Sequence, residues 1–314
     1  MHFPLLSSAA LSLILAGTAS ADIPSVAVDI APVHSLVARV MQDVGTPQLI
    51  LQPGASPHHY ALRPSEAAML QNADLVVWTG SDLTPWLEDP ISTLAGQAQR
   101  LELLAADGTI LLDFRDSASF EPHDHEHEHD HSHDHDHDHD HHHGHDPHAW
   151  LDPRNAEHWM ALIAARLGEI DPDNADIYAA NAATGQAELQ ALSQQIDTAL
   201  APVRDIPFIV FHDAYQYFEN RFGVTAAGSI SLAAGSQPGP ARIAQIRAKV
   251  SDLGVHCAFA EPQFNPGLIQ TVFGPLDAHI GIIDPLGAEL QPGPALYPQL
   301  LRDMTDSLTG CLPE

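Results

Sequence analysis

Three histidines and one aspartate occupy places where a chain of this pattern could bind a metal ion. His58 lies in a loop after an apolar run, His148 ends a His-rich run, and His212 follows the run PFIVF. Asp284 ends the apolar run HIGII and precedes Pro-Leu-Gly. Ligands of open parallel sheets lie beyond the carboxyl ends of the strands, so these four ends could converge on one cleft. Three imidazoles and a carboxylate can complete a tetrahedral zinc shell, and we predict a metal site from these residues.

The His-rich run at residues 121–146 contains a second pattern associated with zinc. His125 to His129 fit H-E-x-x-H, with which metalloproteases hold zinc on one face of a helix. Acids and histidines that alternate without apolar periodicity form no stable helix, so we attribute the match to composition. Such a run cannot bury a core either, and we predict that it is a disordered insertion.

Short apolar runs that are typical of strands alternate with helical patterns on both sides of the insertion. The expected strands are rich in Val, Ile and Leu, and they are residues 25–30, 47–52, 73–80, 207–211, 224–230, 257–261 and 279–284. This alternation predicts an α/β fold with two lobes, each built on a mainly parallel sheet. The expected place for the ligand is the cleft between the lobes.

A long helical segment separates the two halves of the chain. Residues 171–203 contain no Gly or Pro between Asp173 and Thr184, and four apolar side chains lie on one face: Leu189, Leu192, Ile196 and Leu200. We expect one rigid linking helix here. The N-terminal α/β lobe then spans residues 22–170 with the insertion inside it, and the C-terminal α/β lobe spans 204–314.

The first 21 residues have the pattern of a signal peptide. Residues 5–17 form a short apolar run, and Ala19-Ser20-Ala21 matches the small residues that a signal peptidase requires. A buried N-terminal helix is the alternative, although the run is too short to span a bilayer. No Cys follows it for lipid attachment. We therefore expect cleavage after residue 21 and a soluble exported protein.

Charge and cysteine content narrow the chemistry further. The formal net charge of −29 makes nucleic acid and anionic membranes poor partners and cations good ones. Cys257 and Cys311 are the two cysteines, and in an exported protein a pair indicates a disulfide. The alternative is a two-thiolate metal site, which lacks closely spaced companion ligands.

Several short segments give the chain a family resemblance. In order along the chain they read GASPHHYALRPS, DPHAWLDP, VFHDAYQYF, AEPQF and IDPLG, with the acidic His-rich insertion before the second. Together they resemble the ZnuA-type periplasmic zinc-binding proteins of ABC transporters, over nearly the whole mature chain. The resemblance implies a bilobed receptor, with a long rigid helix between the lobes, that captures zinc in the interlobe cleft and delivers it to a membrane permease.

The resemblance also implies roles for single residues. His58, His148 and His212 match the ligands, and Asp284 matches a position where some relatives have a carboxylate ligand and others use water. Relatives often carry acidic residues beside the first ligand, where this chain has Pro57 and His59. Asp284, His59 and water therefore remain open as the group that completes the shell. The two cysteines fit a disulfide that similar receptors carry in the second lobe.

Ligand type indicates which metal to expect. Imidazole suits zinc and copper, whereas manganese prefers more carboxylate oxygen, so zinc is the expected transported ligand. A manganese or copper receptor of the same architecture is an alternative.

Two further alternatives are a periplasmic zinc buffer and a zinc hydrolase with Glu261 as its base. We expect no enzymatic activity, and we expect a monomer whose insertion provides auxiliary weak zinc sites. A solvated spacer, or contact with the permease or an accessory periplasmic zinc carrier, are the other interpretations of the insertion.

Overall fold

The computed structural model describes residues 23–115, 144–231, 239–264 and 279–312 of the 314-residue chain. The predicted signal peptide and most of the predicted insertion lie outside the described residues. Residues 144–146, the end of the predicted insertion, are described. Asp146 is only 2% exposed, and its N–H donates to the Leu112 carbonyl oxygen at 2.8 Å. These last residues therefore belong to the folded part of the chain.

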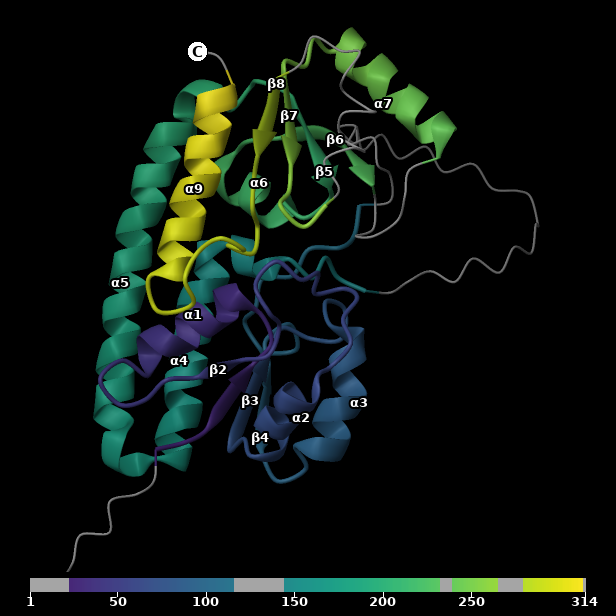
Figure 1. The fold of residues 1–314 in the computed structure, drawn as a ribbon. Coiled ribbons are helices and arrows are strands. Elements are labelled where there is room, and N and C mark those ends of the chain that lie inside the picture. Colours follow the sequence, from purple (N-terminus) through teal and green to yellow (C-terminus); the bar gives the residue numbers. More distant parts are fainter. Residues whose placement is uncertain (1–22, 116–143, 232–238, 265–278, 313–314) are drawn as a thin grey trace, which may run out of the picture.

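Two four-stranded sheets, in which all strand pairs are parallel, form the two halves of the molecule (Figure 1). The first has the order β2-β1-β3-β4, with strands β1 Val26–Val28, β2 Gln48–Leu49, β3 Leu75–Trp78 and β4 Gln99–Glu102. The second has the order β6-β5-β7-β8, with strands β5 Phe208–His212, β6 Ala226–Ser231, β7 Cys257–Ala260 and β8 His279–Ile282. The predicted α/β fold is confirmed.

Burial accounts for the clear sequence signal of the central strands. Every residue of the central strands β1, β3, β5 and β7 is buried, and such strands read as continuous apolar runs. The edge strand β4 has the sequence QRLE, in which only Leu101 is buried. No apolar pattern marks it, and it was not predicted.

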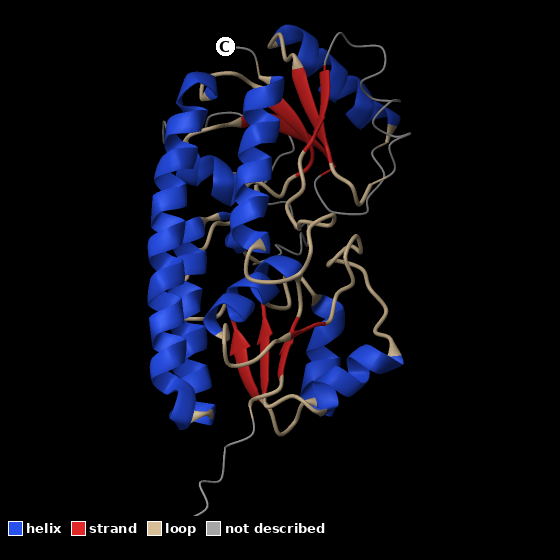
Figure 2. Ribbon diagram, turned by 60° about the vertical axis from the view of Figure 1, so that its left-hand side comes forward, coloured by secondary structure: helices blue, strands red, loops and turns tan. Residues whose placement is uncertain are grey.

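Helices cover the sheets and connect the two halves (Figure 2). They are α1 Ala31–Val40, α2 Pro64–Gln71, α3 Pro85–Leu94, α4 Pro153–Ile170, α5 Ala175–Leu200, α6 Gln216–Phe222, α7 Pro240–Asp252 and α9 Leu296–Cys311. Helix α5 runs beside both halves in Figure 1, with short 3₁₀ turns at Pro172–Asn174 and Ala201–Val203. The segment predicted as one helix at 171–203 is thus an α-helix over 26 residues with a tighter turn at each end.

Helix α9 fastens the C-terminal residues to the first half. The Tyr297 N–H donates to Ser35 Oγ at 2.9 Å, and the Tyr297 hydroxyl donates to the Trp150 carbonyl oxygen at 2.6 Å. Trp150 Nε1 in turn donates to the carbonyl oxygen of Pro285 at 2.8 Å. All three side chains are buried, and the bonds join residues of the first half to residues that follow β8.

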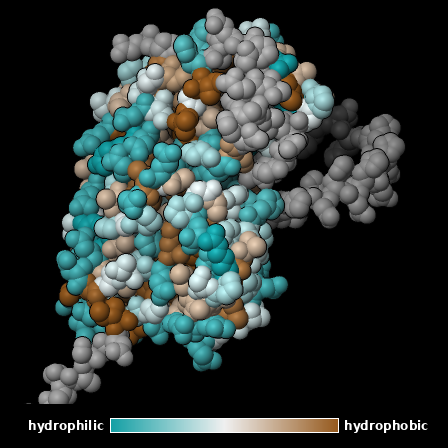
Figure 3. All heavy atoms as spheres, viewed as in Figure 1, coloured by the Kyte–Doolittle hydropathy of each residue, from teal (hydrophilic) through white to brown (hydrophobic). Residues whose placement is uncertain are grey.

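On the face shown in Figure 3, the hydrophobic ones among the described residues form small separate patches between hydrophilic ones. Within the described ranges, no helix combines the length and the apolar character needed to cross a bilayer.

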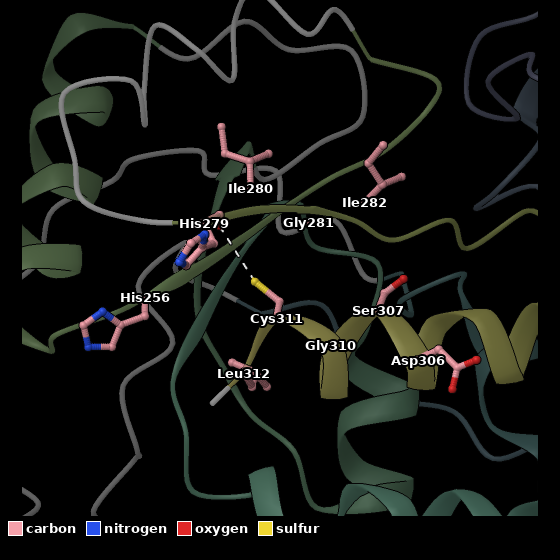
Figure 4. Close-up of a pocket in the computed structure, with 10 residues that line it drawn as sticks. All are labelled: His256, His279, Ile280, Gly281, Ile282, Asp306, Ser307, Gly310, Cys311 and Leu312. Atoms are coloured by element: carbon pink, nitrogen blue, oxygen red, sulfur yellow. Dashed lines mark hydrogen bonds between the residues drawn. The ribbon is translucent and has the colours of Figure 1, made fainter. Parts of the chain in front are cut away.

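The predicted disulfide between Cys257 and Cys311 is confirmed. It joins the first residue of β7 to the last residue of α9, with the Cα atoms 5.9 Å apart. Figure 4 shows Cys311 beside Gly281 and His279 of β8. The bond therefore lies at the amino end of the second sheet, away from the carboxyl ends where ligands of such sheets bind.

Replacing both cysteines, Cys257→Ala with Cys311→Ala, is expected to destabilise the protein by up to roughly 4 kcal/mol, because the bond closes a loop with a sequence separation of 54. Urea unfolding of the oxidised protein and the double variant measures the difference. Reductant should lower the stability of the parent protein to that of the variant and leave the variant unchanged. Equal stability of parent and variant would contradict a stabilising bond.

Candidate metal centre

His212 lies at the carboxyl end of the second sheet, where its strand order reverses. It is the last residue of β5, and Glu261 directly follows β7. These strands are parallel neighbours with Val210 opposite Phe259, so the same register places His212 beside Glu261. His212 Nδ1 and Glu261 Oε1 are 2.6 Å apart, and both side chains are buried. The reversal point of such a sheet forms the crevice in which ligands bind.

His148 is held by its own chain. It directly precedes the 3₁₀ turn Ala149–Leu151 and is 4% exposed. Asp146 Oδ1 accepts hydrogen bonds from the His148 backbone N–H at 3.0 Å and from its Nδ1 at 2.7 Å. An Asp side chain that accepts from the backbone N–H two residues later forms a common local turn, and here the same carboxylate also orients the His148 ring.

His58 comes from the loop between β2 and α2. Trp86 Nε1 donates to the carbonyl oxygen of Pro57 at 2.6 Å, and the Tyr60 hydroxyl donates to Glu66 Oε1 at 2.8 Å. Glu66 is buried in the first turn of α2 and also accepts from the Arg63 N–H at 2.7 Å. Bonds on both sides of His58 therefore fix the course of the loop.

The three imidazoles meet although they are far apart in the sequence. His58, His148 and His212 each offer one ring nitrogen, and these nitrogens all lie within 4.8 Å of one another. The Nε2 atoms of His148 and His212 are 3.3 Å apart. A tetrahedral zinc ion with Zn–N bonds of about 2.0–2.1 Å requires its nitrogens to be roughly 3.3–3.4 Å apart. These two nitrogens thus already have the separation of two ligands on one metal ion.

The structure places the other two candidates outside this group. Asp284 uses its carboxylate to accept from a tight turn, taking the N–H of Leu286 at 2.9 Å, of Gly287 at 3.0 Å and of Ala288 at 2.6 Å. His59 is exposed, whereas its neighbour His58 is half-buried. Among the described residues, the group of possible ligands therefore contains the three histidines without Asp284 or His59.

A small cavity adjoins the histidines. Its volume is about 20 Å³, and its other walls include Trp150, Phe264, Pro285 and Leu286. About 10–15 Å³ suffices for one water molecule, so this space suits a single ion or water. A more spacious hollow of about 820 Å³ lies between β8 and the end of α9 (Figure 4). It offers His256 and His279, but in the described part of the chain no third ligand joins them.

Comparison with known proteins identifies the family. The family model for ZnuA, described as "Zinc-uptake complex component A periplasmic", matches residues 26–311. The chain belongs to the ZnuA family. A "High-affinity zinc uptake system protein ZnuA" of Brucella abortus (strain 2308) is 45% identical, and the match covers 100% of this chain and 99% of that protein. The protein of the same name from Paracoccus denitrificans (strain Pd 1222) is also 45% identical, with 96% and 98% covered.

Solved structures of low sequence identity share the fold. A crystal structure of ZnuA superimposes with a TM-score of 0.75 at 22% identity, covering 93% of this chain and 100% of that one. The laminin binding protein of Streptococcus agalactiae gives a TM-score of 0.74 at 24% identity, covering 92% and 100%. These likenesses agree with the bilobed architecture that the ZnuA resemblance implies.

Protonation differs among the three imidazoles of this ZnuA family member. Burial, with the neighbouring His148 and His212, lowers the pKa of His58 to about 2. Burial and the nearby His212 lower the pKa of His148 well below its ordinary value. Burial acts in the same direction on His212, but the carboxylates of Glu261, Asp213 and Asp146 together outweigh it, so the pKa of His212 is raised. His58 and His148 are therefore neutral at neutral pH, and His212 is the imidazole that takes up a proton first.

Sequence reasoning missed the parts that Asp146 and Glu261 play in this centre. Asp146 was assigned to the insertion, and Glu261 was considered only as the base of a hydrolase. The spacing Asp-Pro-His in front of the site and the position of Glu261 directly after a buried strand were the available signals. Both signals are present in the sequence, but only the folded chain shows that each carboxylate bonds to a histidine.

Zinc affinity is expected to fall as the pH falls through the raised pKa of His212 and through that of Asp146, which burial raises to about 7. Zinc requires the neutral imidazole, and the lowered pKa values keep His58 and His148 unprotonated, so His212 is the ligand at which a proton competes with the metal. Titration against a chelator of known pH dependence, from pH 7.5 to 5.5, measures the slope. A flat profile, or a slope of three protons per zinc, would contradict this assignment.

Proposed function

We propose that this protein captures zinc between its two lobes and delivers it to the permease of an ABC transporter. The observation that carries the proposal is the convergence of the three histidine nitrogens, two of them at the separation of ligands in a tetrahedral zinc shell. Membership of the ZnuA family and the names of the Brucella and Paracoccus relatives support it.

The donor set favours zinc over manganese. All three candidate ligands are imidazoles, which suit zinc and copper, whereas manganese prefers carboxylate oxygen. The nearest sequence candidate for such an oxygen, Asp284, is occupied by the turn that follows it. Copper binds imidazole more strongly than zinc does in general, so the zinc-uptake names of the relatives are what favours zinc over copper.

Capture and release suit the centre better than catalysis does. A zinc hydrolase needs an open coordination position, room for a substrate and a base that faces the metal-bound water. The cavity of about 20 Å³ has no room for an organic substrate. Glu261, the base that the sequence suggested, accepts a hydrogen bond from His212 instead.

The remaining parts of the proposal follow the sequence. Residues 22–170 form the lobe that supplies His58 and His148, residues 204–314 form the lobe that supplies His212, and 171–203 link them. Residues 1–21 direct export to the periplasm, where the protein acts as a monomer. The His-rich insertion collects zinc in weak, exchangeable sites beside His148.

Zinc titration against a competing chelator tests the centre and the insertion separately. The deletion should remove residues 121–143 only, because Asp146 is buried and bonds to His148. The parent protein and the deletion variant are both expected to bind one tight equivalent, and only the parent should bind additional weak equivalents.

The matched control is His212→Ala, which should lose the tight equivalent and keep the weak ones. If deletion of 121–143 removes the tight equivalent, the proposed centre is wrong and the insertion binds the metal. If His212→Ala keeps the tight equivalent, the three-histidine site is wrong.

A further inference from the structure

The candidate ligands present no negative charge to the metal. Neutral imidazoles leave the two positive charges of a zinc ion uncompensated in a buried site, where a charge without a partner is costly. Asp284 would have supplied a carboxylate, but in this structure it accepts from the turn amides. Other carboxylates in the described surroundings bond directly to the ligand rings, and these can supply compensating charge.

Two buried carboxylates lie one imidazole away from the centre. Glu261 Oε1 is 2.6 Å from His212 Nδ1, and Asp146 Oδ1 is 2.7 Å from His148 Nδ1. Glu261 and Asp146 are 4% and 2% exposed. An Nδ1–H that donates to a carboxylate leaves the lone pair of Nε2 free on the opposite side of the ring, and the two Nε2 atoms are the pair 3.3 Å apart.

Rigid elements hold both carboxylates. Glu261 directly follows β7, the neighbour of the strand that ends at His212. Asp146 is held at its backbone, where its N–H donates to the Leu112 carbonyl oxygen at 2.8 Å and its carbonyl oxygen accepts from the Tyr217 hydroxyl at 2.9 Å. The same hydroxyl accepts from the Leu112 N–H at 2.9 Å. The backbone that carries each carboxylate therefore belongs to the folded framework around the centre.

We propose that Asp146 and Glu261 are positioning residues of the zinc centre: they orient His148 and His212, fix the Nδ1–H tautomer and supply the negative charge that the ligands lack. The inference rests on the proposed zinc function. Among the described residues no carboxylate bonds to His58 in this way, so the centre consists of two anchored imidazoles and a third from the loop after β2. Carboxylates bonded to ligand imidazoles raise ligand basicity, and their loss typically weakens metal affinity by 10- to 100-fold.

Zinc affinity of Glu261→Gln and Asp146→Asn tests the charge, because each amide oxygen can still accept from Nδ1–H. Each variant is expected to bind zinc at least tenfold more weakly than the parent, and Glu261→Ala more weakly than Glu261→Gln. Asp284→Asn is the matched control, a carboxylate at the same end of the sheet that bonds to turn amides and Gln263, and it should stay within twofold. Parent-like affinity in both amide variants would overturn the inference.

Imidazole ¹⁵N NMR of the zinc-loaded protein separates positioning from general destabilisation. Nε2-bound, Nδ1-protonated rings are expected for His148 and His212 in the parent, and Glu261→Ala should alter the signature of His212 alone. X-ray absorption should show the same nitrogen ligands in the parent and in Glu261→Gln. An oxygen ligand that disappears with Glu261→Gln would make Glu261 a direct ligand and overturn the inference.

His212→Ala distinguishes failure of this inference from failure of the proposed function. If that variant loses the tight zinc while both amide variants bind like the parent, the zinc centre stands and only the positioning roles fall. If it keeps the tight zinc, the proposed function itself fails. Thermal unfolding of the zinc-free variants identifies any that do not fold, in which case the amide variants carry the test.

Discussion

The arrangement of His148 and His212 is the constraint on which the centre depends. Their Nε2 atoms lie 3.3 Å apart, and with both Nδ1 atoms donating to carboxylates the two lone pairs face each other. Two such lone pairs repel unless a proton or a metal ion lies between them. Without metal, a proton on His212, whose pKa is raised, can bridge the 3.3 Å between the two nitrogens. The bonds to Asp146 and Glu261 orient both rings toward the position that a cation would occupy.

The two sheets make this possible by meeting near their carboxyl ends. His212 and Glu261 come from neighbouring strands of one sheet, while His58 follows β2 of the other. The bonds from Trp150 to Pro285 and from Tyr297 to Trp150 join residues of both halves close to the histidines. Helix α5 runs continuously beside both halves (Figure 1). Preorganisation of the ligands therefore rests on contacts between the halves as much as within them.

The charge of the protein and the charge of the centre act at different ranges. A formal net charge of −29 attracts cations from solution, although salt screens this attraction beyond about 10 Å. At the centre His148 and His212 are buried and His58 is half-buried, and burial lowers the pKa of His58 and His148. These two rings are thus in the neutral form that metal binding requires, while His212, beside Glu261, has the highest pKa of the three histidines.

The sequence alone predicted the class of fold and offered the three histidines, with Asp284, as candidate ligands, because local pattern carries both. Buried central strands read as apolar runs, and His212 stands directly at the end of one of them. The edge strand β4 escaped notice because an edge position needs no apolar run. What only the tertiary structure decided was how the carboxylates are used. Whether Asp284 reaches a metal or accepts from its own turn depends on the path of the backbone after β8, and no local pattern encodes that path. Glu261 meets His212 because their two strands are neighbours, and Asp146 bonds to His148 because the fold sets the direction of that ring. Hydrogen bonds of about 3 Å require atomic placement, and the packing of distant segments supplies it.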